Sequence, residues 1–516
     1  MLSGDGCDDD DVFSFVHAIR RGLTVSANRE ALVCGDRRLT YRSLHDRLQR
    51  VHGALLGLGL SPGDRVAILS FNSIPFVELY CGIPMAGMVQ VPLNFRWADP
   101  ELSYALDDSG ARVLFCDRDP GPLADLVERV IRLDTDEYDD LLAAAPPTPH
   151  DDALDENTLA GLFYTGGTTG QSKGVMLTHR NLIANGWHVQ FTQPMTADDR
   201  YLIMAPLFHA AGSVSVLQSM FVGATQVIMP TFEPGAMLDL VAAEGITQTL
   251  GVPTMVAATV EEQLARPRDI ATFDTYAHGG SPIALEVVRR GAQAFPGVRF
   301  LHLYGATETS PLITGLHDEV DLLDHDRGRS AGQAIMGCEV VIRDDGGDAL
   351  PAGEVGEVTV RGANVMAGYW NKPDQTARSL RDGWYWTGDV GRLDEQGYLF
   401  LLDRSKDMIV SGGENVYCTE VENALYTHPA VLEATVFGIP HDTWGEAVHA
   451  VVVLRDGADD VDADTVIGHC REQIAGYKVP RSVEFRADPL PKSGPGKVLK
   501  RDLRDPFWAG RDGSIG

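Results

Sequence analysis

Short apolar segments alternate with longer amphipathic segments through residues 30–305. Runs such as 65–69 (RVAIL) and 111–116 (ARVLFC) have the length and the β-branched and aromatic content of buried strands, and 225–230 and 298–305 are similar. Segment 44–59 has the 3.6-residue period of a helix instead. This alternation predicts an α/β architecture with largely parallel sheets.

The pattern changes after about residue 330. Segment 339–362 consists of short strands separated by glycine-rich turns, which indicates a small antiparallel β subdomain. A predicted strand at 398–403 leads into a last segment with the pattern of a compact α+β unit. We therefore expect a large N-terminal domain of layered α/β sheets plus the β subdomain over residues 1–402, and a small α+β domain over residues 403–516.

Composition narrows the class of protein. A chain of 516 residues exceeds a single small core, so more than one domain is expected. The net charge of −30 repels phosphate backbones, which argues against nucleic acid as a partner. The seven cysteines form no CxxC pair, which is typical of reduced thiols, and neither a signal peptide nor a transmembrane run is visible. We therefore predict a cytoplasmic protein without a membrane span.

The charge is not uniform along the chain. Residues 471–504 contain nine lysines and arginines against four aspartates and glutamates. Such a stretch is either an ordinary solvated face or a basic surface for a polyanion such as a triphosphate. The composition alone does not separate these two interpretations.

Segment 164–179 (YTGGTTGQSKGVMLTH) concentrates glycine, hydroxyl side chains and one lysine between a predicted strand and a predicted helix at 179–191. Glycines permit positive φ and close backbone approach, so successive N–H groups can surround a phosphate. The Walker loop requires Gly-Lys-Ser/Thr in direct succession, but Gln171 and Ser172 precede Lys173 here, which excludes a P-loop NTPase. On its own, the segment is either a phosphate-binding loop or a plain flexible loop.

Further short motifs follow in a fixed order. They are PLFH (206–209), YGATETS (304–310), YWTGD (385–389), DRSKDMIVSGGENVYCTEVE (403–422), TWGE (443–446) and PLPKSGPGKVLKRDL (489–503). Together with segment 164–179 they closely resemble the signature motifs of the adenylate-forming superfamily, which contains acyl-CoA synthetases, non-ribosomal adenylation domains and firefly-type luciferases. The resemblance covers about residues 30–505 and is closest to bacterial fatty-acid or aryl acid CoA ligases. The chain departs from the pattern at Gly166, where the family has Ser, and at Cys418, where it has Pro.

The resemblance implies a site for ATP and Mg²⁺ in the N-terminal domain. The family's adenine-stacking ring, phosphate-contacting threonine and magnesium-holding glutamate fall on Tyr304, Thr307 and Glu308, and a carboxylate suits Mg²⁺. The ribose contacts fall on Asp389 and Arg404. The remaining residues expected to bind the nucleotide are Thr165, Gly166, Gly167, Thr168, Thr169, Gly170, Lys173, Gly280, Ser281 and Gly305.

The resemblance also implies a mobile C-terminal domain that carries the catalytic lysine, Lys497. This lysine would bridge the substrate carboxylate and the α-phosphate, and the domain would then swing about the hinge at Lys406 to deliver CoA. The residues expected to meet CoA are Gly412, Gly413, Trp444, Lys478 and Arg481. With Lys497, the residues expected to be catalytic are Thr165, Glu308 and His209.

Small or apolar residues are expected to line the acyl pocket. By their positions in the family pattern, the candidates are Trp187, His209, Ala210, Ala211, Gly212, Met255, Gly279 and Gly280. Because segments 209–212 and 279–281 carry little side-chain volume, we expect an open apolar slot. An ATP-dependent acid–CoA ligase of medium or long fatty acids is therefore the first prediction. An aryl or alicyclic acid, or an unusual acid passed to an acceptor other than CoA, is the alternative.

Other members of the superfamily fit less well. An α-amino acid is disfavoured because segment 206–212 has no acidic side chain to pair with a buried ammonium. A luciferase-like oxygenase would share the adenylation step, and fatty-acyl-AMP ligases carry an insertion that is not visible here. A nucleotide-sensing pseudoenzyme would be expected to lose Lys497 or Glu308. The predicted partners are therefore a small carboxylic acid, ATP and CoA, and a homodimer is the assembly considered.

Overall fold

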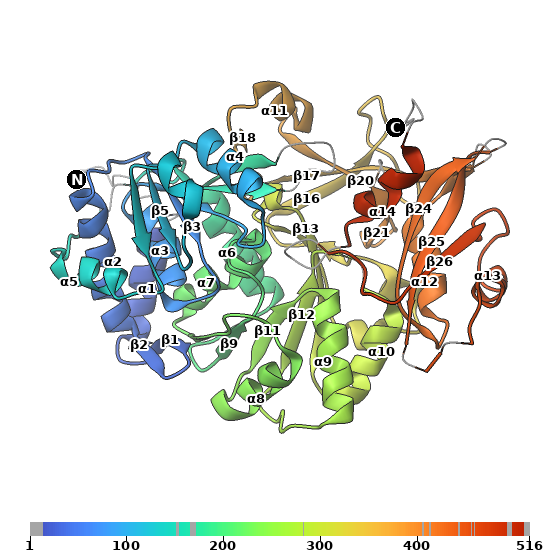
Figure 1. Cartoon of the computed structure of the whole chain (residues 1–516), viewed down its shortest axis with the longest axis horizontal. Helices are drawn as coiled ribbons and strands as arrows, with labels where there is room; N and C mark the ends of the chain where they lie inside the picture. The colour runs from blue at the N-terminus through green and yellow to red at the C-terminus, as the bar shows by residue number, and fades with distance from the viewer. Residues whose placement is uncertain are drawn as a thin grey trace, which may run out of the picture.

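The computed structural model describes residues 14–150, 154–165, 172–281, 283–404, 407–411, 414–441, 444–455, 457–458, 460–492 and 498–509. Within these residues the strands form four sheets, three before residue 405 and one after residue 408 (Figure 1). Two of the sheets are mostly parallel, so the α/β fold predicted from the alternating pattern is confirmed.

The first large sheet is parallel at its centre and antiparallel at both ends. Its strands, in spatial order, are β15 (Gln333–Ala334), β14 (Leu312–Leu316), β13 (Arg299–Gly305), β12 (Thr275–Gly279), β11 (Gln248–Gly251), β9 (Arg200–Ile203), β10 (Thr225–Ile228), β1 (Glu30–Cys34) and β2 (Arg37–Thr40). Its outer face packs on α8 (Pro234–Glu244), α9 (Pro253–Ala265) and α10 (Leu285–Ala294) through a second apolar core.

The second large sheet has seven strands. In spatial order these are β18 (Gly368–Tyr369), β8 (Lys173–Thr178), β7 (Leu159–Thr165), β4 (Val89–Pro92), β3 (Arg65–Leu69), β5 (Val113–Cys116) and β6 (Arg129–Arg132). The sheet is antiparallel at one end only, where β18, β8 and β7 pair. Its outer face is covered by α4 (Asp99–Ser109) and a 3₁₀ turn at Gly121–Leu126.

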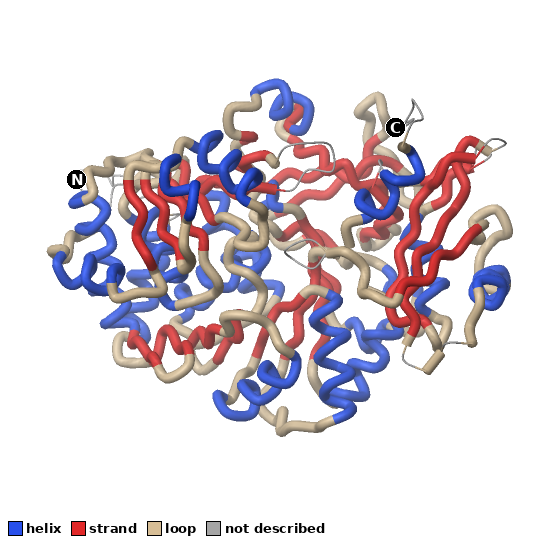
Figure 2. Tube along the Cα trace, viewed as in Figure 1, coloured by secondary structure: helices blue, strands red, loops and turns tan. Residues whose placement is uncertain are grey.

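Five helices lie between the two large sheets and fill the main apolar core (Figure 2). They are α1 (Phe15–Ser26), α2 (Tyr41–Gly57), α3 (Ile74–Met85), α6 (His179–Thr192) and α7 (Ala210–Val222). Every residue of α3 except Pro75 is buried, which explains why this helix lacks an amphipathic pattern. The helix predicted at 44–59 begins earlier, at Tyr41, because Thr40 caps it by accepting a hydrogen bond from the Ser43 amide.

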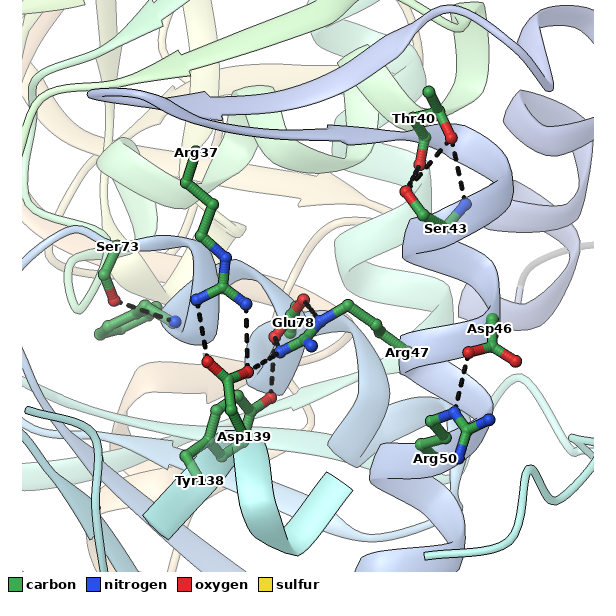
Figure 3. A network of polar contacts seen from close by, with 11 residues as sticks. Arg37, Thr40, Ser43, Asp46, Arg47, Arg50, Ser73, Glu78, Tyr138 and Asp139 are labelled. Carbon is green, nitrogen blue, oxygen red and sulfur yellow. Dashed lines mark hydrogen bonds and ion pairs between the residues drawn. The ribbon is translucent and has the colours of Figure 1, made fainter. Parts of the chain in front are cut away.

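A polar network ties this core to the short helix α5 (Glu137–Ala144) (Figure 3). The carboxylate of Glu78 on α3 is fully buried and accepts hydrogen bonds from the Arg47 guanidinium and, at 3.0 Å, from the Tyr138 hydroxyl. Arg47 also bonds Asp139 at 2.6 Å. A buried carboxylate needs such partners, so the network fixes α2, α3 and α5 against one another.

The remaining N-terminal strands form a small antiparallel sheet, as segment 339–362 predicted. Its strands are β16 (Cys338–Arg343), β17 (Gly356–Gly362), β20 (Trp384–Leu393), β19 (Leu380–Arg381) and β21 (Leu399–Arg404), with α11 (Pro373–Ser379) beside it. Short 3₁₀ turns connect the last strands of the first large sheet: Thr307–Thr309 lies between β13 and β14, and Glu319–Leu322 and Asp326–Arg329 lie between β14 and β15.

The fourth sheet belongs to the C-terminal part and has its own apolar core. It contains β23 (Glu414–Val416), β22 (Ile409–Ser411), β25 (Gly445–Leu454), β24 (Val431–His441) and β26 (Ser482–Arg486), covered by α12 (Cys418–Tyr426), α13 (Ala463–Arg471) and α14 (Lys500–Trp508). The boundary between residues 402 and 403 stays a prediction. Among the described helices, none has the length and apolar composition that a membrane span requires.

Candidate active site

Two predicted nucleotide segments meet where parallel strands of the first sheet end. Gly279 of β12 pairs with Leu303 of β13, so Gly280, just after β12, and Tyr304, near the end of β13, lie at the same carboxyl edge of the sheet. In α/β sheets ligands bind at this edge. Gly305 is required by packing, because an ideal Cβ at this position would lie 1.6 Å from the Pro311 carbonyl oxygen.

A hydrogen bond joins the residue predicted to stack on adenine to a residue predicted to contact ribose. The Tyr304 hydroxyl donates a hydrogen bond of 2.6 Å to Asp389 Oδ2. Asp389 lies on β20 opposite Arg404 of β21, so the two residues predicted to contact ribose are neighbours across an antiparallel ladder. Three sequence segments separated by up to a hundred residues therefore converge, as their predicted roles require.

Glu308 lies in the 3₁₀ turn Thr307–Thr309 and is held from two sides by the segment that ends in β18. The Met366 amide donates to the Glu308 carbonyl at 2.8 Å. The Tyr369 hydroxyl donates to Glu308 Oε1 at 2.8 Å. Tyr369 was not among the predicted site residues; the only sequence signal is the Gly-Tyr-Trp run at 368–370.

The segment predicted to bind phosphate connects two antiparallel strands. Thr165 ends β7, Lys173 begins β8, and the two residues pair across the ladder. From the sequence, we expected this segment to lead from a strand directly into a helix. The structure instead has the strand β8 between the loop and α6. Residues Gly166, Gly167, Thr168, Thr169 and Gly170 lie outside the described residues. Lys173 Nζ lies 4.5 Å from the centre of the Tyr369 ring.

His209 has a structural role at the start of α7. Its Nδ1 accepts a hydrogen bond of 3.2 Å from the Ala211 amide and thereby caps the helix. Burial lowers the pKa of His209 to about 4, so the ring is neutral at pH 7. A neutral imidazole that accepts at Nδ1 carries its proton on Nε2.

Several glycines expected to open the acyl slot are instead packed against backbone. An ideal Cβ on Gly212 would lie 2.1 Å from the Pro206 carbonyl oxygen, and one on Gly279 would lie 2.2 Å from that of Leu303. Ala210 is also buried. These residues are small because the chain passes closely there, so their small side chains do not by themselves open a slot. Gly280 differs, since its nearest neighbour to an ideal Cβ is Val252 at 3.9 Å.

The remaining acyl candidates come from three places around this edge. Trp187 is half-buried on α6, and its ring centre lies 6.1 Å from that of Phe221 on α7. Met255 is buried near the start of α9. Ala211 is half-buried at the start of α7, and Ser281, which was expected to bind the nucleotide, is half-buried just after β12.

Trp444 forms a three-layer stack in the C-terminal part. The His441 ring lies 4.3 Å from the Trp444 ring at 14°, and the Arg481 guanidinium lies 4.6 Å from the Trp444 ring centre. Lys478 is not placed in the same way, because its ammonium bonds both Glu420 oxygens at 2.7 Å. Of the two residues predicted to bind CoA, Lys478 is therefore held in an ion pair with Glu420, whereas Arg481 stacks on Trp444.

The basic stretch 471–504 is largely neutralised by acids from neighbouring elements. Lys478, Lys492 and Lys500 pair with Glu420, Glu433 and Glu422 respectively. These contacts favour the interpretation as an ion-paired face for most of the stretch. Lys406, Gly412, Gly413 and Lys497 and the Arg404 side chain lie outside the described residues.

Comparison with known proteins decides the family. Residues 19–370 match the model of the AMP-binding enzyme family, and residues 420–497 match the model of the AMP-binding enzyme C-terminal domain. The chain belongs to the AMP-binding enzymes. Within this family it is an AMP-forming acyl- or aryl-CoA ligase, as the curated relatives and solved structures support.

The curated relatives span the whole chain. A feruloyl-CoA synthase from an Amycolatopsis species is 40% identical over 94% of this chain and 98% of its own. A fatty acid–[acyl-carrier-protein] ligase from Streptomyces coeruleorubidus is 37% identical over 93% of each chain, and a long-chain-fatty-acid–CoA ligase from Mycobacterium tuberculosis is 33% identical over 95% of this chain and 98% of its own.

Solved structures of AMP-binding enzymes superpose closely on this chain. ATP-bound MatB from Rhodopseudomonas palustris gives a TM-score of 0.87 at 31% identity over 96% of this chain and 99% of its own. The o-succinylbenzoate CoA synthetase of Bacillus subtilis with its acyl-adenylate gives 0.85 at 32% identity over 95% and 98%. The same enzyme has been solved with ATP and a magnesium ion.

Proposed function

We propose that this AMP-binding enzyme is a CoA ligase of a compact aromatic carboxylic acid. The observation that carries the proposal is the close packing around the acyl segments. Gly212 and Gly279 lie against backbone carbonyls, and an ideal Cβ on Gly186 of α6 would lie 2.8 Å from the Phe221 ring. On the neighbouring helices α6 and α7, the rings of Trp187 and Phe221 also lie close together, with their centres 6.1 Å apart.

We infer that the acid binds beside these rings, and tight packing next to aromatic rings favours a flat acid over a long flexible chain. Aromatic rings contact a planar substrate over a large area and in defined geometry, whereas each methylene of an alkyl chain needs additional apolar length. The 40% identical relative is named for a feruloyl group, which is aromatic. Fatty acids, the first prediction from sequence, become the second candidate, supported by the fatty acid ligases among the relatives.

The reaction would proceed in two steps. The substrate carboxylate oxygen attacks the α-phosphorus of ATP, and the bond to pyrophosphate breaks to leave an acyl-adenylate. The thiolate of CoA then attacks the acyl carbon, a thioester forms, and AMP leaves with the electron pair of the broken carbon–oxygen bond. Positioning and neutralisation of charge dominate the first step.

The residues of this chain divide these tasks. We propose that Tyr304 and Asp389 hold the adenosine, that Thr165, Thr307 and Lys173 contact the phosphates, and that Lys497 joins the two anions. Glu308 would hold Mg²⁺, which neutralises charge on the phosphates. The geometry of Glu308 supports its role as a magnesium ligand. Among the described residues only Tyr369 donates to the Glu308 carboxylate, at Oε1, so Oε2 is left for a cation.

The test is pyrophosphate release from the purified protein across a panel of acids, with and without CoA. Benzoate, cinnamate and hydroxycinnamates should react with kcat/KM at least about tenfold above hexanoate, decanoate and palmitate. A series in which kcat/KM rises with alkyl length and aromatic acids are inactive would overturn the aromatic assignment.

A pocket variant sharpens the result. Phe221→Ala should admit longer or bulkier acids, because it removes an aromatic ring from the acid site that we propose between α6 and α7. Phe191→Ala is the matched control, because Phe191 is a phenylalanine on the neighbouring helix α6 that is 61% exposed. A shift in acid preference with Phe191→Ala, or none with Phe221→Ala, would contradict the proposed pocket.

A further inference from the structure

The end of the hairpin formed by β7 and β8 projects beyond the strands on either side of it. β7 pairs with β4 at Gly161, and β8 pairs with β18 at Val175 and Met176. Thr165 and Lys173, where the proposed phosphate segment leaves and rejoins the sheet, lie further along the hairpin. Among the described residues no strand flanks them there, so contacts other than strand pairing must fix their position.

Tyr164 makes one such contact, directly before Thr165. It pairs with Gly174 across the hairpin, and its ring lies over that glycine, because an ideal Cβ there would be 3.1 Å from Tyr164 Cζ. The Tyr164 hydroxyl donates a hydrogen bond of 2.7 Å to Oδ2 of Asp108, near the end of α4. Burial and this hydrogen bond raise the pKa of Tyr164, so the hydroxyl keeps the proton that it donates.

The backbone of Asp108 reaches the β8 side of the hairpin. Its carbonyl lies in the last turn of α4, where carbonyls have no partner within the helix. It accepts hydrogen bonds of 3.0 Å from the Trp370 indole and 3.3 Å from the Asn371 side chain, both just after β18. The Trp370 amide in turn donates to the Gly174 carbonyl at 2.8 Å. Figure 1 shows α4 beside β18.

The Asp108 carboxylate is itself held in a fixed place. Its side chain is 12% exposed, and the Tyr104 hydroxyl and the Lys372 ammonium lie 3.5 and 3.9 Å from its other oxygen, Oδ1. An ionised acceptor makes a stronger hydrogen bond than a neutral one, so the Tyr164 hydroxyl is firmly oriented. Asp108 thus joins both strands of the hairpin at the level where the phosphate segment begins and ends.

We propose that Asp108 is a positioning residue for adenylation: through Tyr164 and Trp370 it fixes Thr165 and Lys173 where they meet the phosphates that leave as pyrophosphate. This inference rests on the proposed role of Thr165 and Lys173 in contacting the phosphates. Asp108 acts through its neighbours and does not touch the reacting atoms.

The experiment measures binding of ATP and of AMP to the full-length protein by calorimetry, in excess Mg²⁺. Tyr164→Phe keeps the ring over Gly174 and removes only the hydroxyl. ATP affinity should fall about tenfold, the low end of the effect of losing a hydrogen bond to a charged group. AMP affinity should change by less than about twofold, because AMP lacks the two phosphates that leave. A general loss of structure would lower both affinities.

Asp108→Asn tests the other partner of the same hydrogen bond. It removes the charge of the acceptor and should lower ATP affinity by a similar factor, again with little effect on AMP. Adding Tyr164→Phe to it should cause little further loss, because both changes weaken one contact. Losses that add in the double variant would overturn the inference.

Two further variants separate this inference from the function that it rests on. Lys173→Met and Thr165→Ala remove the proposed phosphate contacts themselves and should lower ATP affinity but not AMP affinity. If both bind ATP normally, the proposed phosphate role is wrong and the inference falls with it. If they lose ATP affinity while Tyr164→Phe and Asp108→Asn do not, the phosphate role stands and the inference alone is overturned.

Tyr138→Phe is the matched control, because Tyr138 is likewise a buried tyrosine that donates to a carboxylate, that of Glu78 (Figure 3). It should lower the melting temperature and leave the affinities for ATP and AMP unchanged. Equal losses of ATP and AMP affinity in Tyr164→Phe would show that its hydroxyl only stabilises the fold, and would overturn the inference as well.

Discussion

Gly305 illustrates how a single residue can be specified by its surroundings. It ends β13, and the Pro311 carbonyl oxygen occupies the space that a side chain would need, at 1.6 Å from an ideal Cβ. A backbone atom cannot move aside cheaply. Gly305→Ala should therefore destabilise the N-terminal domain by about 3 kcal/mol and weaken ATP binding, because Tyr304 and Thr307 flank the displaced segment.

Thermal unfolding and ATP titration of this variant give the answer, with Gly57→Ala as control. Gly57 is the last residue of α2, is exposed, and has no atom within 4 Å of an ideal Cβ. Alanine there should leave ATP binding unchanged and stabilise the helix by up to about 1 kcal/mol. Similar melting temperatures for the two variants would show that Gly305 is not confined by Pro311.

At the scale of elements, a buried charge joins three helices. Glu78 on α3 is fully buried between Arg47 on α2 and Tyr138 on α5 (Figure 3). Arg47→Met removes the cation and leaves a buried carboxylate without its charge partner. We expect a loss of about 3–5 kcal/mol in the free energy of unfolding, measured by urea denaturation.

The control lies one turn further along α2. Arg50 pairs with Asp46 four residues earlier, and both side chains are partly exposed. Arg50→Met should therefore cost no more than about 0.5 kcal/mol. If both variants lose the same stability, the Arg47–Glu78 pair does not hold the helices together; adding Glu78→Gln to Arg47→Met should recover part of the loss.

At the scale of the whole molecule, one ion pair between described residues joins the C-terminal part to the N-terminal part. Arg455, just after β25, lies 3.4 Å from Glu261 of α9, which also pairs with Arg290 of α10. Ion pairs of partly exposed groups contribute little free energy. Such a weak contact is compatible with the predicted movement of the domain that carries Lys497.

Lys497→Ala should then separate the two half-reactions. Pyrophosphate release from acid and ATP should fall at least about a hundredfold, because the charge that joins two anions is gone, while thioester formation from supplied acyl-adenylate and CoA should persist. Lys492→Ala in the same segment is the control, since Lys492 pairs with Glu433 and should affect neither step. An equal loss of both steps in Lys497→Ala would refute the division of labour.

The sequence by itself determined the class of fold, the order of the motifs and the chemistry. Apolar period and glycine placement are local properties, so strands such as 65–69 and 298–305 and the helix at 179–191 were found close to their observed bounds. Family motifs indicate the residues that we propose bind ATP, and Tyr304, Glu308 and Asp389 were named from them.

Tertiary structure decided what depends on distant neighbours. The strand β8 owes its existence to pairing with β7 and β18, and its sequence alone resembled a loop leading to a helix. The glycines at 212 and 279 are small because carbonyl oxygens lie against them, and Lys478 is occupied by Glu420. Tyr369 connects Lys173 to Glu308 only because three segments far apart in sequence converge there, and no local pattern encodes that meeting.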